Sequence, residues 1–225
     1  MSRKQQVYEY LLEAILSNKL PPGSPIIETE IATALSTSRT PVREALKELE
    51  KDGLVTQYSQ KGTFVSEITP HDVEEIFNLR IMFEVSALQL AYDKINEEEL
   101  NKIESMFSLL DAGSSSAGDF AIADKSLHSL IVDKAGNYRL KQFLSILNAQ
   151  IERFRRIAAM EPTRLTNSKK EHLEIVAKLR QKDLNACETS LRNHLNNVKK
   201  STLEIAKLLL MERTSGKFNK SHKNR

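Results

Sequence analysis

The sequence predicts a mainly α-helical protein, and three observations support this fold class. Only 7 glycines and 6 prolines occur among 225 residues, which is few for a loop-rich β protein. Apolar residues make up 40% of the chain and charged residues 28%, so a packed core is expected. Apolar side chains recur at helical spacing along most of the chain, and only a short stretch after Gly53 changes to the pattern of strands.

The first 68 residues predict three helices followed by a β-hairpin. We expect helices at 5–18, 28–35 and 41–52, and strands at 54–58 and 63–66. Thr40 can cap the third helix, Pro41 suits its first turn, and Gly53 ends it. The second and third helices are short and closely joined, and this order of elements is typical of a winged helix-turn-helix.

A second helical region starts at Thr69-Pro70-His71-Asp72, where Thr69 or Asp72 can cap a helix. Six amphipathic helices follow with short connections, which predicts an antiparallel bundle. We expect these helices at 72–94, 97–110, 117–135, 138–159, 164–181 and 183–211.

The formal net charge of +3 comes from the end of the chain. Residues 212–225 hold five Lys or Arg and one Glu, and subtracting these from the totals of 33 and 30 leaves 28 basic and 29 acidic residues. We expect 213–225 to be a basic, disordered tail. Global charge therefore does not argue for nucleic-acid binding, and such an argument depends on where individual charges lie.

The expected compartment is the cytoplasm. Cys187 is the single cysteine, which excludes an internal disulfide framework and suits a reducing environment. No apolar run approaches the ~20 residues of a membrane span, and the first residues contain no apolar signal segment.

Basic and hydroxyl side chains gather where the third helix begins. In a helix-turn-helix, this end of the second helix of the pair enters the major groove of DNA. Arg39 and Arg43 are four residues apart on one face, and guanidinium groups suit guanine edges or phosphates. The predicted DNA-binding residues are Ser38, Arg39, Thr40, Arg43, Lys47 and, at the tip of the hairpin, Lys61 and Gly62. The alternative for any one of them is a solvated surface side chain.

These segments resemble the GntR family of bacterial transcription regulators over about residues 5–66. The resemblance is carried by Leu20-Pro21-Pro22-Gly23, Ile27-Glu28-x-Glu30-Ile31-Ala32, Ser38-Arg39-Thr40-Pro41-Val42-Arg43-Glu44-Ala45-Leu46, Leu49-Glu50-x-Asp52-Gly53-Leu54-Val55 and Gly62-Thr63-Phe64-Val65. It implies that Arg39 and Arg43 contact bases and backbone and that Gly62 is the glycine of the wing. Thr29 departs from some relatives, which carry an arginine there, so we expect a weaker or differently read operator.

Three histidines in the helical region form a candidate metal site with one aspartate. Asp124 and His128 are four residues apart and therefore share a helix face, while His172 and His194 lie on later helices. One carboxylate and three imidazoles suit zinc, nickel or a similar divalent ion with open coordination positions. From spacing alone, ordinary core or surface histidines remain the alternative.

Residues 70–210 resemble the helical FCD domain of the FadR branch of that family. Its Asp-x-x-x-His, Glu-His and final His pattern is matched by Asp124–His128, Glu171-His172 and His194, which implies that the metal set is complete. The resemblance also implies that Arg80 points toward an effector pocket, although an ion pair with Glu84 is an equal alternative. Arg153 is a second candidate ligand-binding residue, and a solvated basic face is its alternative.

Together these features predict a DNA-binding regulator rather than an enzyme. We expect a DNA-binding domain at 1–68 and an effector-binding, metal-binding and dimerisation domain at 69–212. A homodimer would bind a two-fold operator, and a small carboxylate beside a zinc or nickel ion would relieve repression. One alternative is a regulator that senses the metal ion itself. A metallohydrolase is a weaker alternative, because no acid accompanies the ligands in a motif such as His-Glu-x-x-His.

Overall fold

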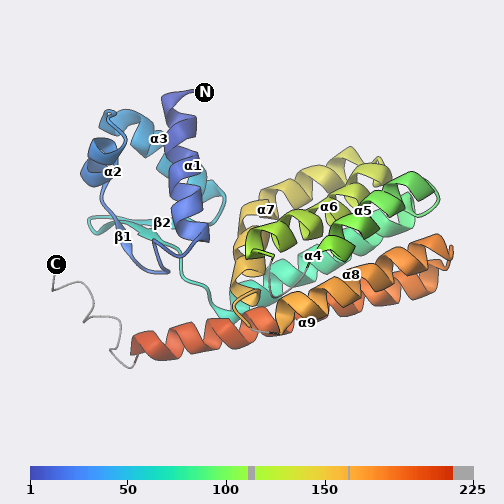
Figure 1. Ribbon diagram of the computed structural model, residues 1–225. Helices are drawn as coiled ribbons and strands as arrows, with labels where there is room; N and C mark the ends of the chain where they lie inside the picture. Colours follow the sequence, from blue (N-terminus) through green and yellow to red (C-terminus); the bar gives the residue numbers. More distant parts are fainter. Residues whose placement is uncertain (111–114, 162, 215–225) are drawn as a thin grey trace. The chain divides into compact units, whose positions relative to one another are not determined.

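Helices dominate the computed structural model, which describes residues 1–110, 115–161 and 163–214 (Figure 1). The described residues divide into an N-terminal unit, which contains Met1–Ile68 together with Ile146–Arg153, and a C-terminal unit, which contains Thr69–Ser145 and the residues from Phe154 onward. The predicted mainly helical class, with a winged helix-turn-helix followed by a helical bundle, is confirmed.

The N-terminal unit contains three helices and a small antiparallel sheet. Its elements are α1 (Arg3–Leu16), β1 (Pro25–Ile26), α2 (Glu28–Ala34), α3 (Arg39–Lys51), β2 (Val55–Tyr58) and β3 (Gly62–Val65). The strand order is β1-β3-β2, with Val55 opposite Val65 and Tyr58 opposite Gly62. The sequence did not predict β1, because a two-residue strand that begins with proline has no detectable alternation.

Helix α1 packs against α3 through a core that includes Val7, Leu11, Leu46 and Leu49. This packing fixes the direction in which the start of α3 faces. The N-cap of α3 is Ser38, whose backbone is extended, so the expectation that Thr40 caps the helix is wrong. Thr40 lies within the first turn, where Pro41 is tolerated because no backbone N–H is needed there.

Six helices follow Thr69 in the described residues, and all of them belong to the C-terminal unit except for Ile146–Arg153, within the fourth of them. They are α4 (Pro70–Ala91), α5 (Glu97–Leu109), α6 (Ala117–Ala135), α7 (Tyr138–Ala158), α8 (Arg164–Arg180) and α9 (Leu184–Thr214). Thr69 caps α4: its hydroxyl accepts a hydrogen bond from the Asp72 N–H at 3.1 Å, and the Asp72 carboxylate accepts one from the Thr69 N–H at 3.2 Å. Helix α9 continues to Thr214, three residues past its expected end, and the rest of the expected tail lies outside the described residues.

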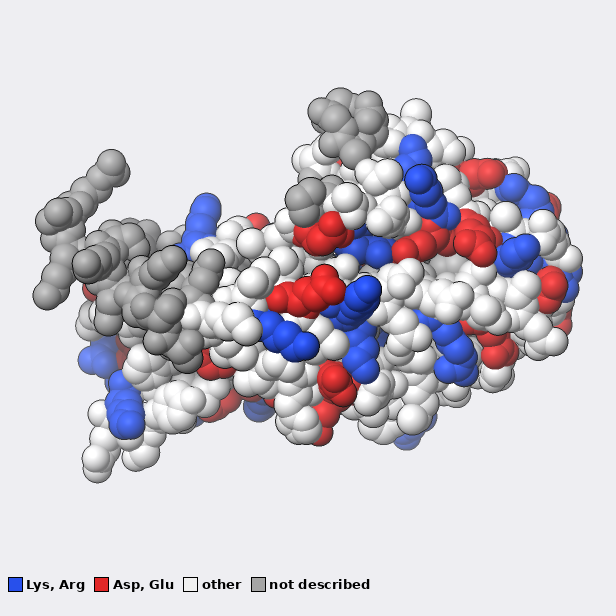
Figure 2. All heavy atoms as spheres, turned by 90° about the horizontal axis from the view of Figure 1, so that it is seen from below, with Lys and Arg blue, Asp and Glu red and all other residues white. Residues whose placement is uncertain are grey.

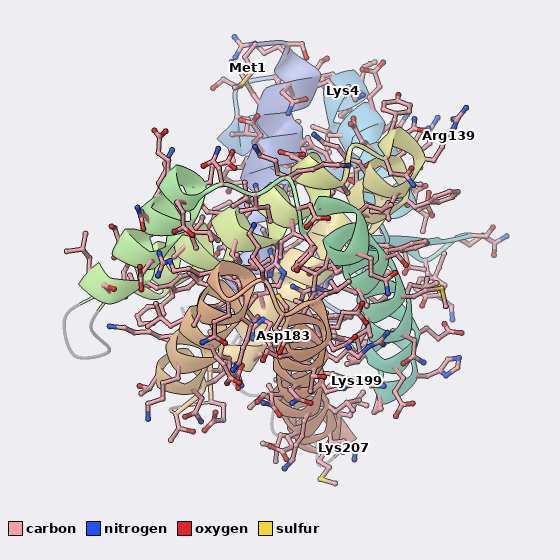
Figure 3. The ribbon with its side chains drawn as sticks, turned by 90° about the vertical axis from the view of Figure 1, so that its right-hand side faces the viewer. Met1, Lys4, Arg139, Asp183, Lys199 and Lys207 are labelled. Atoms are coloured by element: carbon pink, nitrogen blue, oxygen red, sulfur yellow. The ribbon has the colours of Figure 1, made fainter. Side chains whose placement is uncertain are left out.

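Helix α4 packs against α6 and α9, and α8 packs against α9. Figure 3 shows α9 continuing from near Asp183 past Lys199 to Lys207. Lys199 donates a hydrogen bond to Asn78 Oδ1 of α4 at 3.2 Å, whereas Lys207 is exposed. On the face drawn in Figure 2, basic and acidic side chains are interspersed rather than separated by sign. No helix in the described part of the chain is both long and apolar enough to cross a membrane.

The core of this unit is not purely apolar. Phe77, Phe107, Leu127 and Ile175 are fully buried, but so is a group of polar side chains on α4, α6, α8 and α9. The buried polar side chains of these helices include Arg80, Glu84, His128, His172 and His194. Burying so many ionisable groups is costly unless they are paired or bind an ion, which makes this group the natural candidate for a functional site.

Candidate metal centre and nucleic-acid interface

The four residues predicted as metal ligands converge between three helices. Helix α6 supplies Asp124 and His128 from adjacent turns, α8 supplies His172 and α9 supplies His194. One ligand atom from each lies within 4.8 Å of all the others. Asp124 Oδ1 is 3.1 Å from Nε2 of His172, 3.7 Å from Nε2 of His128 and 4.0 Å from Nε2 of His194. Ligands bound ~2.1 Å from one ion lie at comparable separations from each other.

The outer nitrogen of each histidine is already held by an oxygen atom. The partners of the three Nδ1 atoms are Glu84 Oε2 for His128, the Ser168 carbonyl at 2.7 Å for His172 and Glu171 Oε2 at 2.8 Å for His194. Because a carboxylate or carbonyl oxygen only accepts, each Nδ1 carries the proton and each Nε2 presents a lone pair toward the centre. This arrangement is the one that metal-binding histidines adopt.

The centre therefore contains lone pairs that face one another. Nε2 of His128 and of His172 are 3.4 Å apart, and both face the Asp124 carboxylate. His194 Nε2 is buried without a hydrogen-bond partner among the described residues. Opposed acceptors are unfavourable unless a cation lies between them, so the donor set fits a divalent ion.

Burial and neighbouring charges favour the forms of these side chains that can bind a metal. Burial lowers the pKa of His128 and holds the pKa of His194 well below its usual range, so both rings stay neutral. Burial alone would raise the pKa of Asp124, but the Arg155 guanidinium and the nearby histidines hold it well below its usual range. The carboxylate is therefore ionised.

Two ion pairs orient the acidic groups of the site. Arg155 on α7 pairs with Asp124, with Nε 2.6 Å from Oδ2, which leaves Oδ1 directed at the histidines. Arg164 on α8 pairs with Glu171, and Asn197 donates to the same carboxylate at 2.9 Å. Arg155 and Arg164 were not predicted from the sequence, and Glu171 was named only as part of the family pattern.

Arg80 lies beside this cluster on α4 and is fully buried. Its Nε donates to Glu84 Oε1 at 2.7 Å, so the ion pair that the sequence left as an alternative is present. Its Nη1 and Nη2 have no hydrogen-bond partner among the described residues. The ion pair therefore occupies one edge of the guanidinium and leaves the other edge without a hydrogen-bond partner among the described residues.

Arg153 is also buried, and burial lowers its pKa to about 10. The described contacts of the metal cluster include Arg155 and not Arg153. A ligand-binding role for Arg153 stays a prediction.

The predicted DNA-binding side chains lie on the surface at the start of α3 and at the hairpin tip. Arg39 and Arg43 are exposed, and both are paired with Glu28 at the start of α2. Arg39 Nη2 is 2.7 Å and Arg43 Nε 2.9 Å from Glu28 Oε2. Burial alone would raise the pKa of Glu28, but the two arginines lower it. The structure thus places the two arginines together, in an arrangement set by a carboxylate that sequence reasoning missed.

The other predicted DNA-binding residues are also accessible. Gly62 has a φ of +97°, which favours glycine, and a side chain there would meet open space. The departure from the family pattern, Thr29, is exposed as well. The remaining exposed members of this group are Ser38, Thr40, Lys47 and Lys61.

Two family models match this chain. The model for bacterial regulatory proteins of the gntR family matches residues 3–65, and the FCD domain model matches residues 75–197. The first match includes every predicted DNA-binding residue, and the second includes all four residues of the metal cluster.

Curated relatives and solved structures agree with these matches. The HTH-type transcriptional regulator YdhC of Bacillus subtilis is 31% identical, covering 85% of this chain and 87% of its own. The HTH-type transcriptional repressor RspR of Escherichia coli is 26% identical, covering 89% of each chain. The Zn²⁺-bound FCD domain of TM0439 is 26% identical with a TM-score of 0.52, covering 62% of this chain and 96% of that one.

Replacing His172 with alanine should remove metal from the protein. We expect wild-type protein dialysed against zinc and then buffer to retain one ion per chain by elemental analysis, and His172→Ala to retain much less. The variant should also lose the increase in melting temperature that zinc gives, because a bound ion stabilises by about 2.7 kcal/mol at 100 times its Kd.

His71→Ala is the matched control, since His71 is exposed at the start of α4 and far from the cluster in sequence. Equal zinc content in wild type and His172→Ala would remove His172 from the ligand set.

Proposed function

The chain belongs to the gntR family of bacterial regulatory proteins and carries an FCD domain, and we propose that it is a repressor whose operator affinity is controlled by a small carboxylate bound beside a divalent metal ion. It is a DNA-binding transcriptional regulator and not an enzyme, as the sequence resemblance implied. One observation carries the proposal. The same helical core contains a cluster of potential metal ligands, Asp124 and three histidines, and a buried arginine, Arg80, whose Nη1 and Nη2 have no hydrogen-bond partner among the described residues.

Asp124, His128, His172 and His194 would hold the ion, with zinc or nickel the expected metal. When bound, the ion supplies a double positive charge and open coordination positions for carboxylate oxygens. The likeness to an FCD domain that binds Zn²⁺ supports this assignment. The Nδ1 hydrogen bonds of the three histidines keep Nε2 available before the ion arrives.

The charges around the cluster argue for an anionic effector. Arg80 and Arg155 offset Glu84 and Asp124, so a bound ion adds two positive charges that no acidic group of this set balances. The Nη1 and Nη2 atoms of Arg80 offer the paired donors that suit a carboxylate. This edge of Arg80 favours an organic acid as effector over the ion acting alone.

Arg39 and Arg43 would read the operator from the start of α3, and Lys61 and Gly62 would approach the adjacent groove. Ser38, Thr40 and Lys47 would bind phosphates. The similarity to RspR, a transcriptional repressor, supports repression as the mode of action. Effector binding would change the operator affinity by thermodynamic linkage.

A homodimer would present two α3 helices, one to each half of a two-fold operator. An apolar face on α4 supports this assembly: Met82 is 60% exposed, Leu90 44% and Leu79 40%. Phe83 on the same helix stacks on Phe143 of α7, which is 54% exposed. A contiguous apolar surface of this kind is typical of a contact between chains.

Arg43→Ala should weaken operator binding. With an operator selected from a random-sequence DNA pool, we expect a cost of about 1–3 kcal/mol if Arg43 contacts a base edge. Lys51→Ala, at the far end of the same helix, should bind within a factor of about two of wild type. Unchanged affinity for Arg43→Ala would show that another element reads the DNA.

Succinate should raise the melting temperature of the zinc-loaded protein. It should do so in wild type and in Arg180→Met, whose arginine forms surface ion pairs on α8, but not in Arg80→Met. If neither succinate nor acetate shifts the wild-type transition while zinc alone changes operator affinity, the ion itself is the effector.

Met82→Lys should weaken dimerisation, because it places a charge in the apolar face of α4. Sedimentation equilibrium should give a dimer for wild type and a larger monomer fraction for the variant at equal concentration. Met160→Lys, which changes an exposed methionine after the end of α7, should sediment as wild type. A monomeric wild type at micromolar concentration would contradict the dimer.

A further inference from the structure

We propose that Glu84 is a positioning residue whose carboxylate orients both a metal-binding imidazole and the anion-binding guanidinium. The metal site and the effector site of the regulator would then depend on the same carboxylate. This inference rests on the proposed function, because it needs a metal ion and a carboxylate effector in the same core. It assigns a role to a side chain that is neither a metal ligand nor an effector contact.

Glu84 lies on α4 and is 4% exposed. Its Oε1 accepts a hydrogen bond from Arg80 Nε at 2.7 Å, and its Oε2 accepts one from His128 Nδ1. Burial alone would raise the pKa of Glu84, but Arg80 and His128 lower it. Each oxygen of one rigid, planar group thus serves one functional partner.

The two bonds set the working geometry of both partners. The bond to His128 fixes the proton on Nδ1 and turns Nε2 toward the metal centre. The bond to Arg80 uses Nε and leaves Nη1 and Nη2 for a ligand. The Phe77 ring, 5.6 Å from Arg80 Cζ, adds packing on the guanidinium. Moving the Glu84 carboxylate would displace an imidazole and a guanidinium together.

The other two histidines are held without any contact to Arg80 in the described part of the chain. His172 is fixed by the Ser168 carbonyl of its own helix. His194 is fixed by Glu171, whose remaining partners are Arg164 and Asn197. Glu171 therefore provides a matched control, because it also orients a metal-binding histidine but does not bond to Arg80.

The test compares Glu84→Gln with Glu171→Gln, using zinc and succinate as probes in isothermal titrations of the full-length protein. A glutamine keeps the size of the side chain but has one acceptor oxygen, so at position 84 it cannot serve both donors. We expect zinc affinity to fall about 10- to 100-fold in both variants, as removing the support of a metal ligand typically does. At saturating zinc, succinate affinity should fall about tenfold or more in Glu84→Gln only.

Circular dichroism and thermal unfolding identify variants that fold. If Glu84→Gln does not fold, Glu84→Asp replaces it, since the shorter carboxylate keeps the charge but cannot reach both partners, and the same double loss is expected. Loss of zinc affinity alone or of succinate affinity alone at position 84 would overturn the inference, as would equal succinate affinity in the two glutamine variants. Failure of wild type to bind zinc or succinate would instead overturn the proposed function.

Discussion

The convergence of three imidazole lone pairs and one carboxylate oxygen inside a helical bundle is the constraint around which the polar core is arranged. Such a group is unfavourable in an apolar interior unless a cation lies at its centre. The surrounding side chains keep the group in this form: oxygen acceptors hold each Nδ1 proton, and Arg155 keeps Asp124 ionised. Two of the three helices that supply the ligands, α6 and α9, also pack against α4, which carries Arg80 and Glu84. The candidate metal ligands, Arg80 and the packing of these helices are therefore linked through direct contacts.

Part of this site could be predicted from the sequence, and the rest depends on the fold. The spacing of Asp124 and His128 places both on one helix face, while His172 and His194 were assigned through a family pattern. Glu84 was seen only as a neighbour of Arg80, because nothing local shows that α4 faces α6. Arg153 and Arg155 show the same limit: residues two positions apart on a helix lie about 200° apart around its axis, so only one of them can face a given site. The sequence Arg153-Phe154-Arg155-Arg156 does not show which one does.

The N-terminal unit was more predictable, because its order of elements depends on local signals. Helix spacing, Gly53 and the hairpin pattern gave the three helices and two of the strands, whereas β1 was too short and the cap of α3 was placed two residues late. The pairing of Glu28 with Arg39 and Arg43 could not be predicted, since it joins the starts of two helices. This pairing holds both guanidinium groups together on the exposed face and leaves Nη1 and Nη2 of Arg43 outside the ion pair. These ion pairs thus hold the proposed DNA-binding arginines in place within the N-terminal unit.

X-ray absorption at the zinc edge identifies the atoms bound to the ion without any substitution in the protein. For the zinc-loaded wild type, we expect scattering from three imidazole rings at about 2.0–2.1 Å together with an oxygen shell. A spectrum with fewer than two imidazole rings, or with only oxygen ligands, would contradict a metal centre built from Asp124, His128, His172 and His194.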